Sequence, residues 1–539
     1  MNRKIYHIAF TAVASLFMLT SCNDFLDTQP DNRPSVDSES KVAALVTSAY
    51  PSNSYAFVTE VSSDNVDDYG ANNPYTDRFF DQLYAWTDLT ESNNDDTERF
   101  WNQSYKAIAS ANEALKAIDE IEAKGESSTV LTECRAEALL ARAYNHFMLV
   151  NVFSKHYNQK TSTTDPGIPY TTEPETTLQP SYTRGTVAGV YEKIAEDLEA
   201  ALPFVGDSHL TKAARYHFNR QAAYAFACRF YLYYEKWDKA IEYANKCLGT
   251  APASMLRDWS YMATMPQGDA GRQAIEEHYV SANVNCNLLL LTAYSSMGLA
   301  FNPYYLYSRY SHGRYLATLE TGEAVKVLWG GGEYYERMAV YEATNMDMTI
   351  FWKLPLLFEY TDPVAGTGYR HTVITALTAD ECLLNRAEAY ILKGEYDKAL
   401  ADMNLWISNI VRADENPQPL TLSGVVDMMN ALPYAYSDVD GIASTPKKHL
   451  NPDFTIGAEG SEQECMLQCL LMLRRVETLQ TGLRWFDIKR YGIEYPRRTM
   501  NASGLPFKKT DFLSKDDPRR AIQIPLKVRQ AGLEANPRN

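Results

Sequence analysis

Residues 222–248 read AAYAFACRFYLYYEKWDKAIEYANKCL, and residues 381–407 repeat the pattern as ECLLNRAEAYILKGEYDKALADMNLWI. The two stretches align without a gap, so that Trp237 corresponds to Tyr396. In each copy an apolar helix is followed by a short polar break and a second helix. The second helices carry apolar residues at the i, i+3, i+4, i+7 spacing of one buried face. Each copy therefore predicts a helical hairpin.

Such hairpins cannot bury their apolar face alone and must stack on neighbours. Ala240 and Ala399 are small enough to let a partner helix approach closely. Gly394 lies in the second break, where a positive φ costs little, and Glu235 has that place in the first. This is the pattern of tetratricopeptide repeats, which form scaffolds. We therefore predict a mostly α protein, with a tetratricopeptide-like helical-hairpin scaffold and a large irregular, loop-rich insertion that carries the ligand surface.

The overall composition excludes some classes of function. A net charge of −17 over 539 residues argues against nucleic-acid binding, which needs a basic surface. The 37 tyrosines exceed what helix packing requires and suit contact with sugars or peptides. The eight cysteines show no CxxC spacing, so we expect no metal finger, and we expect Cys228, Cys247 and Cys382 to be buried free thiols.

The N-terminus predicts export. Residues 1–21 combine a basic start with an apolar run of twelve residues, which would span about 18 Å as a helix and is too short for a bilayer core of about 30 Å. We interpret 1–21 as a lipoprotein signal peptide. Leu19-Thr20-Ser21-Cys22 looks like a lipobox, which makes Cys22 the lipid attachment site and 22–38 a lipidated, proline-containing tether. The alternative is an ordinary signal peptide followed by a chance cysteine.

Several further stretches occur in the order typical of one family. They include WNQSYKAIASANEAL at 101–115, RAEALLARAYNHFMLVNVF at 135–153, LLNRAEAYILKGEYDKAL at 383–400, RRVETLQTGLRWFDIKRYG at 474–492 and IQIPLKVRQAGLEANP at 522–537. With these stretches the chain resembles the SusD/RagB family, surface lipoproteins of Bacteroidetes that capture nutrients for a TonB-dependent transporter. One departure is Gln523-Ile524-Pro525, where the family has a Phe-Pro-Ile-Pro type ending.

The resemblance implies one SusD-like body over 39–539. Its parts would be N-terminal helical repeats at 39–250, an irregular ligand-binding insertion at 251–375, and a C-terminal repeat with the family's C-terminal region at 376–539. The resemblance also implies an outer-membrane protein, lipid-anchored and facing the cell exterior, with a SusC-like transporter as partner.

Aromatic residues in irregular segments are the candidates for ligand contact. Trp329 stands before Gly330–Gly332, and without a following Lys-Ser/Thr this is not a phosphate loop, so we interpret it as a mobile loop that displays Trp329 and Tyr334. An aromatic ring can stack on the apolar face of a pyranose while polar side chains bind its hydroxyls. The ligand-binding candidates are Tyr75, Trp86, Tyr304, Trp329 and Tyr334, with Asn73 and Arg309 as polar partners; for each of them, ordinary packing is the alternative.

An acidic run precedes these candidates. Asp64, Asp67 and Asp68 could help to hold a structural calcium ion, but Val66 fills a position that an EF-hand needs for a ligand. We therefore prefer a solvated loop and expect no cofactor.

No motif for catalysis is present in the sequence: HExxH, GxSxG, P-loop and GxGxxG patterns are all missing. Our first hypothesis is a non-enzymatic surface lipoprotein that captures oligosaccharides and delivers them to a SusC-like TonB-dependent transporter. The alternatives are a peptide-capturing RagB-like protein and a surface glycoside hydrolase, since paired carboxylates cannot be recognised from sequence.

Overall fold

The computed structural model describes residues 36–538, apart from 71–72, 74, 176–180, 211, 267–268, 302–307, 336–337, 344–345 and 437–441. The predicted signal peptide, Cys22 and Tyr304 lie outside the described residues. Among the helices of the described part, none combines the length and apolar character needed to span a bilayer.

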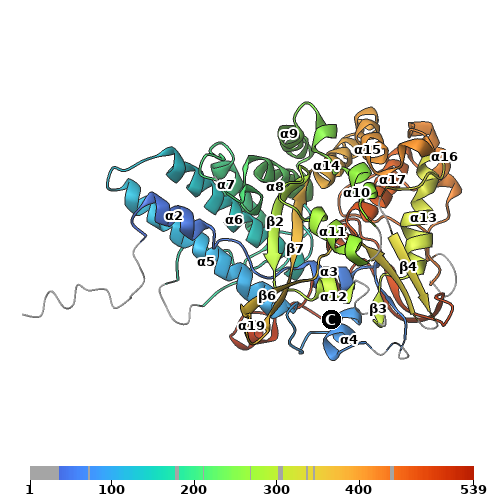
Figure 1. The fold of residues 1–539 in the computed structure, drawn as a ribbon, viewed down its shortest axis with the longest axis horizontal. Helices are drawn as coiled ribbons and strands as arrows, with labels where there is room; N and C mark the ends of the chain where they lie inside the picture. Colours follow the sequence, from blue (N-terminus) through green and yellow to red (C-terminus); the bar gives the residue numbers. More distant parts are fainter. Residues whose placement is uncertain are drawn as a thin grey trace, which may run out of the picture.

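Two long helices dominate the N-terminal part. α5 and α6 lie side by side, and α7 packs against α6 (Figure 1). Each long helix starts at a side-chain cap: Asp96 accepts a hydrogen bond from the backbone N–H of Arg99, and Ser128 from that of Leu131. The helices here are α2 (Glu39–Val46), α3 (Ala56–Ser62), α4 (Arg78–Tyr84), α5 (Thr97–Glu122), α6 (Thr129–Phe153) and α7 (Val187–Ala201).

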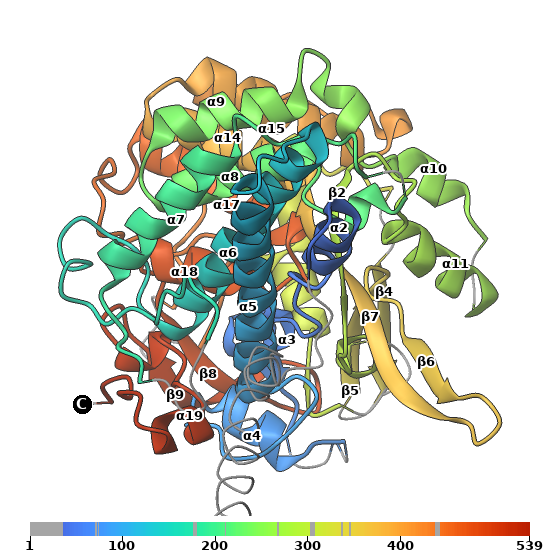
Figure 2. The same ribbon diagram turned by 90° about the vertical axis from the view of Figure 1, so that its left-hand side faces the viewer.

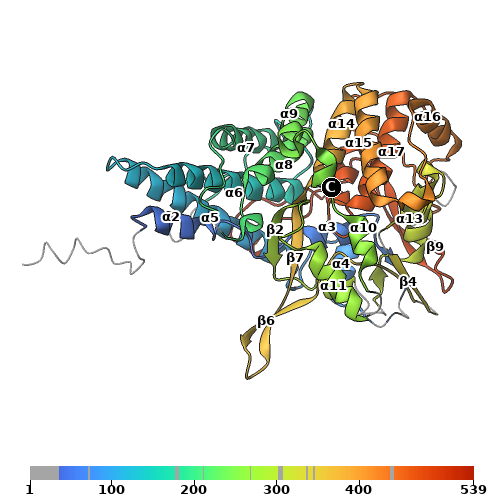
Figure 3. The same ribbon diagram turned by 45° about the horizontal axis from the view of Figure 1, so that its top comes forward.

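Both predicted hairpins are present. They are α8 (Arg220–Tyr233) with α9 (Trp237–Leu248), and α14 (Ala379–Leu392) with α15 (Tyr396–Ile410). Both breaks contain a residue with positive φ, 58° at Glu235 and 74° at Gly394. Ala240 and Ala399 are fully buried, and α9 packs on α14, so that the hairpins stack (Figure 3). The prediction of a mostly helical, tetratricopeptide-like scaffold is confirmed.

Buried polar contacts join the two hairpins. The Nε of Arg229 in α8 donates to Oε1 of Glu381 in α14 over 2.8 Å. Arg386 in α14 binds Asp402 of α15 and, through Nη1, the Oδ1 of Asn245 in α9 at 2.8 Å. All four helices of the two hairpins are thereby joined. The cysteines of this region are buried and free, as the sequence predicted.

Residues 251–375 contain more regular structure than the sequence indicated. Strands β2, β7 and β6 form an antiparallel sheet in that order, and β4 pairs with β5. The β6–β7 hairpin projects from the body (Figure 3). The elements are η2 (Pro252–Met255), α10 (Trp259–Thr264), α11 (Asp269–Tyr279), β2 (Asn287–Ala293), α12 (Met297–Ala300), β3 (Tyr310–Ser311), η4 (Leu316–Glu320), α13 (Gly322–Val325), η5 (Lys326–Trp329), β4 (Met338–Ala343), β5 (Met346–Phe351), β6 (Leu357–Asp362) and β7 (Thr367–Thr378).

A second sheet joins three distant parts of the chain. Its order is β3-β1-β8-β9, with β1 (Asp67–Asp68) antiparallel to β3 and parallel to β8. The remaining C-terminal elements are η6 (Ala413–Glu415), α16 (Leu422–Ala431), α17 (Glu462–Glu477), α18 (Arg484–Arg490), β8 (Tyr495–Met500), β9 (Pro506–Leu513), η7 (Pro518–Arg520) and α19 (Leu526–Gln530); the short turn η1 (Ala214–Tyr216) precedes α8.

Candidate functional site

Three of the sequence-predicted site residues meet where β1 pairs with β3. The backbone N–H of Arg309 donates to the carbonyl of Tyr75 over 2.9 Å, and Nδ2 of Asn73 donates to the carbonyl of Ser308 over 3.3 Å. A parallel bridge also joins Tyr75 to Ser308. We call this place the 73–75/308–310 junction. It unites the first irregular segment with the insertion, across more than 230 residues of chain.

The side chain of Arg309 is fixed at this junction. Its Nε and Nη2 donate to the two carboxylate oxygens of Asp68 over 2.7 and 2.9 Å, and Asp81 lies 3.4 Å from Nη1. The hydrogen bond with Asp68 is the main reason that the pKa of Arg309 is raised. The guanidinium lies 5.0 Å from the ring centre of Tyr310 and keeps 26% of its side chain exposed. A half-buried Tyr75 and a positioned guanidinium therefore share one edge of the molecule.

Beneath the junction lies a buried cluster of charges around Glu320. The carboxylate accepts from Nη2 of Arg498 and Nη1 of Arg475 at 2.8 Å each, and from Nζ of Lys448 at 3.1 Å. Burial alone would raise the pKa of Glu320. The three cations outweigh this effect and hold its pKa well below the ordinary value. Burial beside other cations lowers the pKa of Lys448 to about 8. Arg498 also binds Asp67 of β1, which connects this cluster to the junction.

The acidic run is not a solvated loop, so that interpretation is wrong. Asp64, Asp67 and Asp68 are each at most 6% exposed. Each forms an ion pair with an arginine: Asp64 with Arg484, Asp67 with Arg498 and Asp68 with Arg309. The guanidinium groups supply the positive charge that a calcium ion would have supplied. Within the described residues, no group of three His, Cys, Asp or Glu side chains could hold a metal ion.

Trp86 lies inside the fold. Its backbone has a φ of 52°, its Nε1 donates to the carbonyl of Ser62 over 2.9 Å, and only 7% of the residue is exposed. The guanidinium of Arg497 lies 4.2 Å from its ring centre, and the ring of Tyr495 packs edge-on against it at 5.4 Å. In this arrangement its ring is covered by protein.

Trp329 and Tyr334 lie together, but they are not displayed. Their exposed fractions are 1% and 9%, and their rings meet edge to face at 5.3 Å. Nε1 of Trp329 donates to the carbonyl of Gly332 over 2.8 Å, and the Tyr334 hydroxyl to that of Gly322 over 2.8 Å. The expectation that the glycine loop presents these rings to solvent is therefore wrong. The carbonyl of Gly332 binds the indole N–H, the carbonyl of Gly322 in α13 binds the tyrosine hydroxyl, and both rings are buried.

Other aromatic side chains are exposed that the sequence reasoning did not select. The β6–β7 hairpin (Figure 2) carries three of them, Phe358, Tyr360 and Tyr369. Their exposed fractions are 42%, 59% and 55%. Phe204, after α7, is 58% exposed. The alternation of residues 357–360 could have indicated a strand with one aromatic face, whereas nothing in the local sequence marks Phe204.

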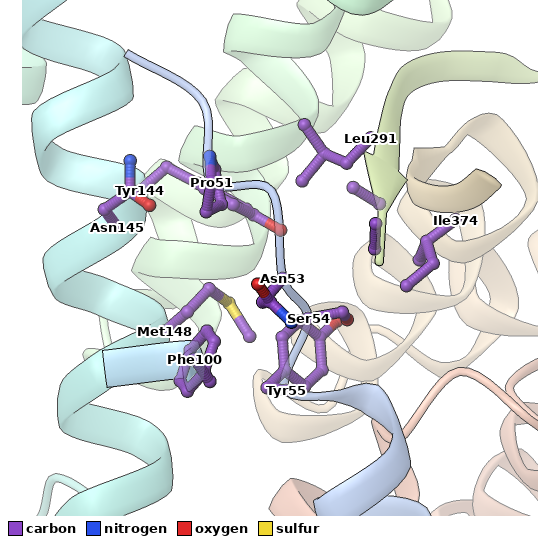
Figure 4. Close-up of a pocket in the computed structure, with 12 residues that line it drawn as sticks. Pro51, Asn53, Ser54, Tyr55, Phe100, Tyr144, Asn145, Met148, Leu291 and Ile374 are labelled. Atoms are coloured by element: carbon purple, nitrogen blue, oxygen red, sulfur yellow. The ribbon is translucent and has the colours of Figure 1, made fainter. Parts of the chain in front are cut away.

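A cavity between α6 and the β2–β7 sheet is too small for a ligand. It lies among Tyr55, Phe100, Met148, Leu291 and Ile374 (Figure 4) and has a volume of about 10 Å³. Sites for small molecules usually have about 300–1,000 Å³. This cavity can hold at most one water molecule.

Comparison with known proteins agrees with this architecture. Residues 24–232 match the model of the SusD-like family described as "Starch-binding associating with outer membrane". A putative sugar binding protein from Bacteroides vulgatus ATCC 8482 superposes with a TM-score of 0.63 at 17% identity, over 94% of this chain and 99% of the other. A SusD superfamily protein from Bacteroides thetaiotaomicron VPI-5482 gives 0.61 at 17%, over 92% and 98%. No curated protein matches the sequence.

The chain therefore has the SusD fold over nearly its whole length. At 17% identity, these structures show the fold alone. The family match over residues 24–232 agrees with the resemblance drawn from the sequence.

Proposed function

We propose that this chain is a carbohydrate-binding protein of the outer-membrane surface, which captures oligosaccharides and delivers them to a SusC-like TonB-dependent transporter. The observation that carries the proposal is the 73–75/308–310 junction, which holds a half-buried tyrosine beside a partly exposed, rigidly paired guanidinium. The family's description as starch-binding and a structural relative named as a sugar binding protein support carbohydrate as the ligand.

The chemistry of the junction suits a sugar. A tyrosine ring such as that of Tyr75 can stack on the C–H side of a pyranose. The guanidinium of Arg309 has five N–H donors, of which Asp68 takes two and Asp81 one, so the remaining two can reach sugar oxygens. Because Asp68 fixes its orientation, little side-chain entropy is lost when the ligand binds. The role of this site is binding without catalysis.

Calorimetric titration with a panel of neutral oligosaccharides tests the proposal. Tyr75→Ala should weaken the binding of the preferred glycan about 10-fold, equivalent to about 1.4 kcal/mol. Tyr261→Ala removes a ring that is 52% exposed on α10 and should leave affinity unchanged. Equal affinities of wild type and Tyr75→Ala for every glycan bound would refute the role of the junction.

Further measurements separate the alternatives. Peptides that displace the glycan, or that bind in its place, would favour a peptide-capturing protein of the RagB type. Release of reducing ends from polysaccharides would favour a glycoside hydrolase. Delivery predicts that the chain co-purifies with a SusC-like transporter, and Cys22→Ser should release it from the membrane fraction if lipid at Cys22 is the anchor.

A further inference from the structure

A groove of about 500 Å³ lies at the N-terminal end of α6. It is bounded by the α5–α6 turn, the turn that follows α7 and the first residue of α8. This volume is within the range of about 300–1,000 Å³ that is usual for small-molecule sites. α4 contacts Arg309 through Asp81. α5 begins after α4 and ends at the α5–α6 turn that lines the groove. Its 26 residues make it about 39 Å long, so the groove is remote from the 73–75/308–310 junction.

The walls of the groove combine an aromatic ring with polar groups. Phe204 is 58% exposed and lines it together with the exposed side chains of Ser127, Thr129 and Arg220. The guanidinium of Arg220 has no hydrogen bond or ion pair within the part of the chain that the structure describes. A ring face, two hydroxyls and a set of N–H donors thus face the same space.

Glu133 adds a buried acceptor with unused capacity. Its side chain is 10% exposed and lines the groove. Its Oε2 accepts from Oγ of Ser208 at 2.6 Å and lies 3.0 Å from Nδ1 of His209. Its Oε1 receives no hydrogen bond from any described residue. A Cβ at Gly206 would lie 2.0 Å from Oε1, so glycine leaves the space in which this oxygen sits.

The wall that carries Phe204 is held in place. His209 lies between two glutamates of α6, with Nδ1 3.0 Å from Oε2 of Glu133 and Nε2 2.8 Å from Oε2 of Glu137. This contact ties the segment after α7 to α6 only five residues beyond Phe204. A ring fixed in this way loses little freedom when a ligand stacks on it.

We propose that this groove is a second carbohydrate site, which takes a neutral sugar residue. The apolar face of the sugar stacks on Phe204, one sugar hydroxyl donates to Oε1 of Glu133, and Arg220 donates to other sugar oxygens. Because Glu133 and Arg220 carry opposite charges, these two walls give no net charge that would select an acidic or a basic sugar. The ligand class rests on the proposed function, whereas the groove itself shares no residue with the junction. A long glycan that reaches both ends of α5 would be held at two points and would bind more tightly than a short one.

Fluorine NMR of protein labelled with 4-fluorophenylalanine tests the groove directly. The probes are the methyl glycosides of glucose, galactose, mannose and xylose, and the Phe204 signal is assigned by its loss in Phe204→Leu. At least one probe should shift this signal saturably with a Kd near 10 mM, and the signal of Phe507, which is also 58% exposed, should stay in place. Glu133→Gln should weaken the response at least 3-fold. Because the Glu133 variant also alters the His209 contact, Arg220→Ala, whose side chain makes no described contact, gives a second reading.

The outcomes distinguish this inference from the function proposed above. A Phe204 signal that does not move with any probe up to about 0.1 M, where such a site would be about nine-tenths filled, would overturn the second site. A shift shared equally by Phe507 would overturn it as well. The Phe204 response should persist in Tyr75→Ala, so that loss of binding at the junction alone leaves the groove supported.

Discussion

Removal of one buried charge should test whether the Glu320 cluster holds the fold together. Glu320→Gln keeps the shape of the side chain but leaves Arg475, Arg498 and Lys448 buried around a neutral amide. All three cations lie within 3.1 Å of the carboxylate. Breaking a buried ion pair by removing one partner costs about 3–5 kcal/mol, because the remaining charge stays buried without compensation. We expect this loss in the free energy of unfolding in urea at pH 7.

The matched control is the same exchange at a surface ion pair. Glu242 and Lys246 are 2.7 Å apart on α9, with side chains 53% and 46% exposed, and such pairs contribute only about 0.3–0.5 kcal/mol. The pKa of Glu320 is lowered in the fold, so its contribution is present above the pKa of the unfolded chain and is lost as the pH falls towards the folded value. The difference between wild type and Glu320→Gln should therefore shrink in acid. Equal losses for Glu320→Gln and Glu242→Gln at pH 7 would refute the reasoning.

Two other variants test the space around a buried glycine and the protonation of a buried lysine. Gly482 has a φ of 76°, and a Cβ there would lie 2.2 Å from Oγ1 of Thr59, whereas Gly331 has a φ of 98° and open space around it. Gly482→Ala should therefore lower the free energy of unfolding in urea by about 1–3 kcal/mol more than Gly331→Ala does. Similar losses in the two variants would contradict this. Burial lowers the pKa of Lys489 to about 7, while its ammonium donates to two backbone carbonyls. Because the unfolded chain then binds more protons between pH 7 and about 10, stability should rise with pH in that window, and the rise should be smaller in Lys489→Met. An unchanged slope in urea midpoints measured at pH 7 and 9 would contradict this assignment.

The scaffold could be predicted because its signals are local. The apolar spacing within 222–248 and 381–407 depends on neighbouring turns of one helix, and the structure forms both hairpins there. Glu235 was correctly placed opposite Gly394, and both adopt a positive φ. The strands of the insertion were missed, because their partners lie far away in the sequence and the tyrosines and glycines of that region suggest loops.

The candidate site was predicted only in part. The sequence selected both segments of the junction, since they are irregular and rich in polar and aromatic residues. It did not reveal the burial of Asp64, because the arginine that neutralises this side chain follows 420 residues later. The prediction that Trp329 is exposed was wrong, because a run of glycines does not determine whether the neighbouring indole points to solvent or into the core.

The parallel contact between β1 and β8 has a consequence for biogenesis. Asp67 and Arg498 are 431 residues apart, so the base of the junction needs a strand that leaves the ribosome long after the first helices. A premature stop before residue 495 would still encode both helical hairpins, yet it would lack the strand on which the junction rests. Such a fragment should lose binding at the junction while it keeps the residues that line the groove at Phe204.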